Sequence, residues 1–220
     1  HRFRRAGIGA RRATFDGMVA GLKDRFTCIT YDLRGHGLSP LPDGRFGLDD
    51  LVDDLEALHA LMGRSIAQNQ SDFLTPQQVA ASDKVMGLDT QLVRDGTYFL
   101  IECEGRIAGC GGWSFRATLY GGDDSVVARE PATLDPASDA AKIRAMYTDP
   151  DFTRRGIGAR ILALCEDAAR QAGFQRVELM GTAAGVPLYR AQGYTPVAAP
   201  EYASVGDVEI PLLRMEKHFG

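Results

Sequence analysis

The loop at 153–160, TRRGIGAR, constrains the fold of this chain most strongly. It separates a strand-like run, KIRAMYT (142–148), from a stretch at 156–173 whose apolar residues recur at helical spacing. Gly156 and Gly158 let the backbone approach a ligand without a Cβ atom in the way. The first turn of a helix leaves N–H groups unpaired and carries the positive end of its dipole. The pattern therefore predicts a strand–loop–helix unit that binds phosphate groups; the alternative is a helix start that merely contains glycines.

Two common phosphate-binding motifs do not fit this loop. A Walker loop requires Gly-Lys-Ser/Thr, which is absent. A dinucleotide fingerprint requires a third glycine where Ile161 stands, and its turn follows the strand at once, whereas seven residues (149–155) separate Thr148 from Gly156. Glu178 lies at a suitable distance for a ribose ligand, but it falls inside a strand. A third ligand class that competes for such a loop is the pyrophosphate of coenzyme A.

The chain resembles the GNAT superfamily of acetyl-CoA-dependent N-acetyltransferases. The family motif Q/R-x-x-G-x-G/A maps to residues 153–158, where Thr153 departs from the usual Gln or Arg. Three other segments fall in the family's order: TYFLIECEGRIAGCGGW (97–113), GFQRVELM (173–180) and GVPLYRAQGY (185–194). The likeness covers about 55–220. It implies an α/β (α+β) fold with a mixed, mostly antiparallel central sheet flanked by helices, here extended by an N-terminal helix–strand–loop fragment.

The resemblance also implies a reaction. An acetyl group would pass from acetyl-CoA, the cosubstrate, to a primary amine of an unidentified small molecule or peptide by direct attack in a ternary complex. Tyr189 would protonate the departing thiolate. Glu178 is the candidate general base, and its alternative role is that of a solvated strand residue.

The remaining site residues follow from the same resemblance. Trp113 and Arg116 would border the acceptor pocket, although a lone tryptophan also suits the core. The N–H of Met146 would face the thioester oxygen. The coenzyme would be bound by Met146, Tyr147, Thr148, Thr153, Arg154, Arg155, Gly156, Ile157, Gly158 and Ala159.

A second resemblance lies at about 14–63, where a strand-like run, the turn DLRGHGLS and a helical stretch follow the order found in α/β-hydrolases. Such an enzyme needs a nucleophile in G-x-S-x-G after a strand. Ser65 lies in GRSIA within a helical pattern, Ser114 in GWSFR lacks the last glycine, and Ser39 belongs to the turn itself. The sequence therefore offers no hydrolase nucleophile.

We accordingly expect an incomplete hydrolase-like segment (1–54) and a GNAT domain (55–220). The join is concealed, because the apolar spacing of LVDDLEALHALMG (51–63) suits a helix of either family. One alternative is that FTCITYDL (26–33) docks as the first strand of the GNAT sheet.

Composition narrows the partners and the setting. A net charge of −4 argues against a nucleic-acid partner. Four cysteines without CxxC spacing predict no metal site and a reducing, cytoplasmic location. No apolar run approaches the length of a membrane span. Two other functions stay open, an acyl-CoA-binding module without catalysis and a hydrolase remnant with esterase activity, as does a homodimer formed through the final strands.

Overall fold

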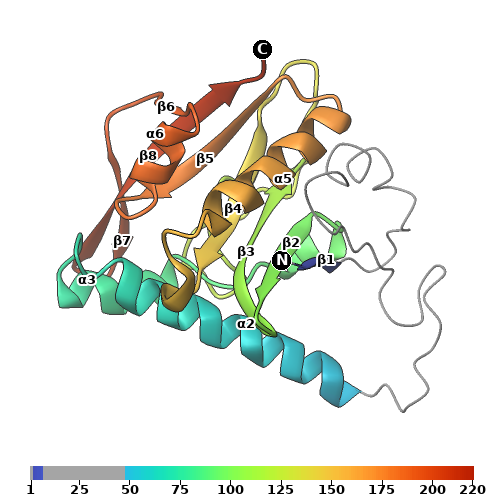
Figure 1. Ribbon diagram of the computed structural model, residues 1–220. Coiled ribbons are helices and arrows are strands. Elements are labelled where there is room, and N and C mark those ends of the chain that lie inside the picture. Colours follow the sequence, from blue (N-terminus) through green and yellow to red (C-terminus); the bar gives the residue numbers. More distant parts are fainter. Residues whose placement is uncertain (1, 7–47) are drawn as a thin grey trace, which may run out of the picture.

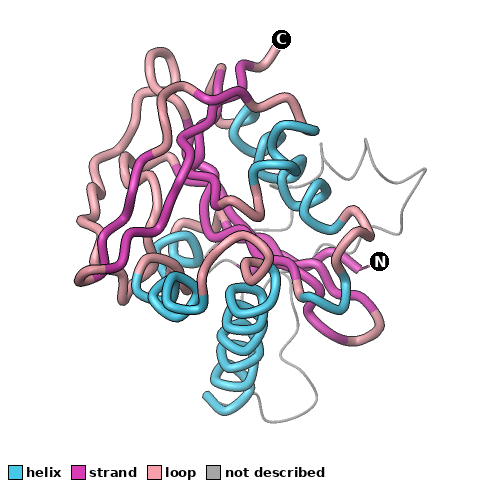
Figure 2. The backbone as a smooth tube through the Cα atoms, turned by 90° about the vertical axis from the view of Figure 1, so that its left-hand side faces the viewer, coloured by secondary structure: helices cyan, strands magenta, loops and turns pink. Residues whose placement is uncertain are grey.

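The computed structural model describes residues 2–6 and 48–220. The described chain forms one sheet with helices on both of its faces (Figures 1 and 2). The helix, strand and turn that the sequence predicts before residue 45, including FTCITYDL, lie outside the described residues.

The sheet contains eight strands: β1 (Arg2–Ala6), β2 (Tyr98–Cys103), β3 (Arg106–Ser114), β4 (Ala141–Thr148), β5 (Arg176–Thr182), β6 (Thr195–Pro196), β7 (Glu201–Val205) and β8 (Val208–His218). Their order is β1-β2-β3-β4-β5-β8-β6, with β7 also paired to β8. Every pair is antiparallel except β4–β5. These pairings confirm the predicted mixed, mostly antiparallel sheet.

The helices are α2 (Leu48–Asn69), α3 (Pro76–Ala81), α4 (Thr90–Arg94), α5 (Ile157–Gln171) and α6 (Val186–Ala191). Single 3-10 turns lie at Ser82–Lys84 and Pro150–Phe152. A parallel strand pair needs a crossover connection, and α5 supplies it between β4 and β5. Figure 1 shows α5 lying along β3 and β4, and Figure 2 shows α2 on the opposite face of the sheet.

Each face of the sheet buries its own apolar layer. Ile161 and Leu162 of α5 pack against β-strand residues such as Ile143 on one face. Leu61 of α2 packs with Tyr98 and neighbouring side chains on the other. Strand residues therefore alternate between two buried layers, which fixes the register of the central strands.

Two elements differ from the sequence-based expectation. In the sequence, Thr75-Pro76 followed by Gln78 predicts a helix at 75–86. It begins as expected, with Thr75 and Gln78 forming a capping box. It narrows into a 3-10 turn at Ser82, whose hydroxyl donates to the Gln78 carbonyl at 2.8 Å. The helix α4 was not predicted; Asp89 begins it by accepting a hydrogen bond from the N–H of Gln91 at 3.1 Å.

The edge of the sheet beside β2 carries a strand that the pattern of the sequence did not identify. The strand β1 pairs there with β2, Arg2 opposite Glu102 through Ala6 opposite Tyr98. The docking of FTCITYDL as a first strand falls outside the described residues and stays a prediction.

Candidate active site

The strands β4 and β5 part from one another halfway along their length. Their ladder consists of Ala141, Lys142 and Ile143 of β4 opposite Val177, Glu178 and Leu179 of β5, respectively. Beyond Ile143 the described residues of β4 form no further pair with β5. Of residues 145–148, Tyr147 and Thr148 pair with β3 and none pairs with β5, so the side of the strand toward β5 can accept a ligand.

A β-bulge in β4 marks the point where the strands part. Cys110 of β3 lies opposite Tyr147 and Gly112 opposite Arg144, so the single residue Gly111 faces both Ala145 and Met146. Ala145 has a positive φ of 50°. A side chain at Gly111 would collide with Met146 and come within 2.7 Å of Ile161 Cγ2. The bulge therefore requires glycine at this position.

The start of α5 has the geometry that the glycine loop predicts. Gly156 is the N-cap residue with φ 77°, and no side chain of the described residues caps it. Arg154 also has a positive φ of 61°, and left-handed residues in such a turn help successive N–H groups converge into an anion-binding concavity. A Cβ atom at Gly156 would meet nothing within 4 Å, whereas one at Gly158 would lie 2.8 Å from Leu188. Gly156 thus faces open space and Gly158 permits close packing.

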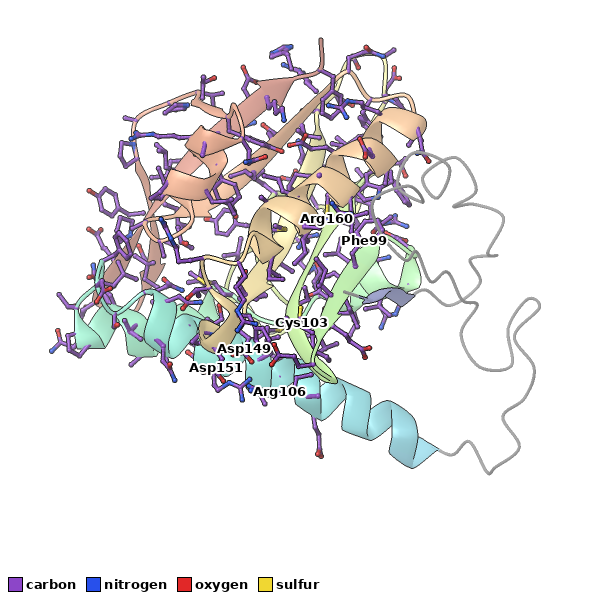
Figure 3. The ribbon with its side chains drawn as sticks, in the orientation of Figure 1. Phe99, Cys103, Arg106, Asp149, Asp151 and Arg160 are labelled. Carbon is purple, nitrogen blue, oxygen red and sulfur yellow. The ribbon has the colours of Figure 1, made fainter. Side chains whose placement is uncertain are left out.

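Side chains from other elements hold this loop in place. Asp149 is fully buried, and its Oδ1 accepts from the N–H of Asp151 at 3.0 Å. Its Oδ2 pairs with Arg64 of α2 and, at 3.4 Å, with Arg106 of β3, which also binds Asp151 at 2.8 Å (Figure 3). Asn69 donates to the Thr148 carbonyl at 2.8 Å. The end of β4 is therefore fixed to both α2 and β3.

Of the two arginines before Gly156, Arg155 has described partners at the loop's edge. Its guanidinium lies 3.1 Å from Glu104 and 5.0 Å from the centre of the Phe152 ring. Both members of the ion pair are at least half exposed, so their attraction is weak in water. Arg155 can therefore exchange Glu104 for a phosphate at little cost.

A pocket of about 80 Å³ fills the gap between the parted strands. Its lining comes from β4, β5, α6, β8, the turn before α4 and the loop after β3, and includes Ala145, Met146, Tyr147, Met180, Tyr189 and Leu212. Tyr147 closes one side, because its hydroxyl oxygen accepts from the N–H of Gly87 at 2.7 Å. The pocket therefore joins the predicted acid to the backbone predicted to bind the thioester.

Tyr189 reaches the pocket because two glycines leave room for its ring. A Cβ atom at Gly181 would lie 3.3 Å from the ring, and one at Gly185 would lie 2.8 Å from it. Burial, with a smaller contribution from the nearby Cys165, raises the pKa of Tyr189 well above its ordinary value of 10. The phenol is therefore protonated throughout the neutral range.

Glu178 lies outside this pocket. It lines a neighbouring one and is bound by two cations, the buried Lys142 and Arg214, whose guanidinium lies 2.6 Å away. Burial alone would raise the pKa of Glu178, but the hydrogen bonds from Lys142 and Arg214 outweigh that effect and lower it. This environment suits a permanent anion that joins β4, β5 and β8. Its role as a general base stays a prediction.

Trp113 and Arg116 also lie away from the pocket lining. Trp113 is 6% exposed, and its ring makes edge-on contacts with Phe115 and Phe174 at 6.0 Å. Arg116 binds both carboxylate oxygens of Asp95, at 2.7 and 2.9 Å. Both side chains therefore have structural partners, and their substrate roles stay predictions.

The pocket contains a residue that sequence reasoning missed. Arg144 of β4 lines it and is paired at 2.6 Å with Asp89. Its guanidinium also donates to the Gly121 carbonyl at 2.7 Å, which holds the loop after β3 against the pocket. Two cations, Lys142 and Arg144, in an otherwise apolar strand were the signal available in the sequence.

Two kinds of site are absent from the part of the chain that the structure describes. No cluster of three His, Cys, Asp or Glu side chains is arranged to hold a metal ion there. None of the helices in that part combines the length and hydrophobicity that crossing a membrane requires.

One curated protein resembles part of the chain. It is a 2-(acetamidomethylene)succinate hydrolase from Mesorhizobium japonicum, 39% identical over 61 residues. The match covers 28% of this chain and 22% of the hydrolase, so the chain spans about a fifth of this relative. The likeness supports the hydrolase-like character of a segment and says nothing of a complete hydrolase.

Solved structures share the fold over most of the chain. A GCN5-related N-acetyltransferase from Rhodopseudomonas palustris has 14% identity and a TM-score of 0.55, with 76% of this chain and 91% of that chain covered. An N-acetyltransferase from Staphylococcus aureus Mu50 has 16% identity and a TM-score of 0.50, over 76% and 93%. The profile of the acetyltransferase (GNAT) family matches residues 66–194, which is more than half of the sequence. The chain therefore belongs to the GNAT acetyltransferase family, whose members are acyltransferases that use acetyl-CoA.

Proposed function

We propose that the chain transfers the acetyl group of acetyl-CoA to a primary amine by direct attack in a ternary complex. The observation that carries this proposal is the parting of β4 from β5 beside the uncapped N-terminus of α5. The first feature leaves strand backbone for the pantetheine arm, and the second leaves N–H groups for the pyrophosphate. Residues 146–148 and 153–159 would hold the coenzyme.

The chemistry needs a neutral amine, a polarised carbonyl and a proton for the leaving group. The amine nitrogen attacks the thioester carbon, the N–H of Met146 stabilises the developing oxyanion, and the C–S bond breaks with its electron pair on sulfur. Tyr189 donates its proton to that sulfur and regains one from the acylated nitrogen through solvent. The products are an acetamide and the free thiol.

In our proposal, none of the described pocket residues removes the proton from the amine. The lining contains no carboxylate or imidazole among these residues. We therefore propose that the acceptor binds as its free base, and that the paired Glu178 acts as a structural anion instead of the general base.

We also propose a division of the chain that departs slightly from 1–54 and 55–220. Residues 55–220 form most of the acetyltransferase domain. The strand β1 is paired with β2 of that domain's sheet, and the helix α2 already begins at Leu48, so both belong to the domain as well. The hydrolase-like segment would then be an insertion before α2. Cys103, Cys110 and Cys165 are free and buried, which suits a reducing cytoplasm.

The decisive test measures acetyl-CoA binding by calorimetry in wild type, Gly156→Glu and Gly206→Glu. Both glycines have positive φ, 77° and 58°, and a Cβ at either meets nothing within 4 Å. The two variants therefore carry similar backbone strain. We expect Gly156→Glu to abolish binding, because it places a carboxylate in the phosphate site, and Gly206→Glu, in the β7–β8 turn, to bind normally. No heat of binding to folded wild type would end the proposal.

An acyl-CoA-binding module without catalysis is the second candidate function. Thr153 at the first motif position and the absence of a base among the described lining residues favour it. Release of the coenzyme thiol, followed with a thiol reagent in the presence of varied amines, separates the two. Amine-dependent release supports the transferase, and tight binding without release supports the module.

A further inference from the structure

Arg144 sets the charge of the pocket between β4 and β5. Of the described residues that line it, only Arg144 carries a formal charge. Its side chain is 2% exposed. The rest of the lining is apolar or carries hydroxyl groups, as at Thr182 and Tyr120. The side chain that most affects which acceptor enters is therefore a buried guanidinium.

The hydrogen bonds of Arg144 are incomplete. One terminal nitrogen donates to the Gly121 carbonyl at 2.7 Å and lies 2.6 Å from Asp89 Oδ2 in an ion pair. The Nε atom is buried and has no hydrogen-bond partner among the described residues. A buried donor without an acceptor is costly. A bound acceptor whose oxygen approached this guanidinium could supply the missing acceptor.

Arg144 belongs to a network of four ionic side chains, two positive and two negative. Asp89 is shared with a second arginine, Arg129, which in turn pairs with Asp123 at 2.7 Å. Burial lowers the pKa of Arg144; Asp89 opposes this shift and Arg129 adds to it. Of these four side chains only Arg144 lines the pocket, so an anion bound there would be attracted and a cation would be repelled.

We propose that the acceptor is a small amine that carries a carboxylate, bound by Arg144 while its amino group faces the thioester at Met146. This inference rests on the proposed acetyl transfer. Arg144 and Met146 flank the bulge residue Ala145 on β4 and line the same pocket. A compact acceptor such as an α- or β-amino acid could therefore contact both. Diamines and other polycations would place a second positive charge against the guanidinium.

The test compares matched acceptors with wild-type protein. L-Valine, L-valinamide and isobutylamine share a side chain and differ in the carboxyl group; L-alanine, L-alaninamide and ethylamine repeat the comparison at smaller size. Thiol release from acetyl-CoA gives kcat/KM, expressed per free-base amine because the amino groups differ in pKa. We expect the carboxylate to be preferred over the plain amine by about tenfold to a hundredfold, as for hydrogen bonds to a charged group.

Two variants assign the preference to Arg144. Arg144→Gln should remove it, while Arg129→Gln, which alters the same ion network outside the pocket lining, should keep it. Circular dichroism checks that both variants are folded. If they are not, the comparison of carboxylate-bearing and plain amines with the wild-type protein decides whether the acceptor carries a carboxylate.

The outcomes separate the two proposals. Equal rates for carboxylates and plain amines, or faster transfer to 1,4-diaminobutane, would overturn the inference and leave acetyl transfer standing. Failure to bind acetyl-CoA, or binding without transfer to any amine, would overturn the proposed function and this inference with it.

Discussion

Tyr189 and its two glycine neighbours show how single residues position the proposed chemistry. The ring can lie in the pocket because Gly181 and Gly185 have no side chains to displace it. The same burial that holds the ring raises its pKa, so the phenol keeps its proton. Position and protonation state thus have one cause.

Replacement of Tyr189 by Phe tests this arrangement. We expect kcat to fall by about 10²–10⁴, the usual contribution of a general acid, with acetyl-CoA affinity nearly unchanged. Tyr194→Phe is the matched control, because Tyr194 is buried 5.9 Å from Tyr189, between ring centres, but does not line the pocket. Since the raised pKa keeps the phenol protonated, wild-type kcat should not decline as pH rises from 8 to 10. Unchanged kcat in the Phe variant would remove Tyr189 from the mechanism.

At the scale of elements, the β4 bulge depends on Gly111. Gly111→Ala should lower the free energy of unfolding by about 1–3 kcal/mol, the cost of overpacking, because Met146 and Ile161 leave no space for a methyl group. Gly63→Ala, at an exposed position in α2 where a Cβ meets nothing, should raise it by about 0.5–1 kcal/mol. Urea unfolding measures both. Equal effects would show that general glycine flexibility, and not the bulge, controls stability.

The ions that join β4, β5 and β8 predict a pH-dependent stability. Glu178→Gln leaves the buried Lys142 without its anion and should cost about 3 kcal/mol at pH 7. The lowered pKa of Glu178 means that its contribution is present above the unfolded value of about 4.3 and is lost as pH falls through the folded value. The difference in the free energy of unfolding between variant and wild type, measured with denaturant, should therefore become smaller below about pH 4. A gap independent of pH would contradict the ionic account.

Elements with strong local signals could be predicted, and those set by tertiary contacts could not. The apolar spacing of α2 and α5, and the glycine loop between β4 and α5, are visible in the sequence. The helix α4 has only five residues, and Asp89 was its single signal. The bulge at Ala145 follows from pairing with β3, which no pattern within β4 contains.

For the molecule as a whole, the question is which family supplies its chemistry. Ser65, the nearest match to a hydrolase nucleophile, is buried within α2, where its hydroxyl oxygen accepts from Asn69 at 3.1 Å. A nucleophile elbow needs a strand-to-helix turn. The environment of Ser65 is therefore that of a helix-packing residue.

Ser65→Ala should consequently leave any hydrolysis of p-nitrophenyl acetate unchanged and cost about 1 kcal/mol of stability through the lost hydrogen bond. Absorbance of released p-nitrophenolate and urea unfolding give the two readouts. Loss of ester hydrolysis in a folded variant would restore the hydrolase alternative.

The pocket between β4 and β5 could be anticipated at the level of the whole molecule, but not all of the side chains that line it. The resemblance placed Tyr189 and the backbone at Met146 beside one another, and both line the pocket. Arg144 escaped prediction because its direction depends on the bulge and on Asp89, 55 residues earlier. Glu178 was chosen for its charge, and its cationic neighbours come from two other strands.

The bulge at Ala145 has a consequence for how this architecture can change. Arg144 and Tyr147 face the same layer although they are three positions apart, because Ala145 is supernumerary in the ladder. Deletion of Ala145 would leave all the remaining side chains of β4 on their present faces and would straighten β4 toward β5. Deletion of this one residue would thus favour continuous pairing of β4 with β5 and close the gap between them. Insertion of one residue into a regular strand would create such a gap.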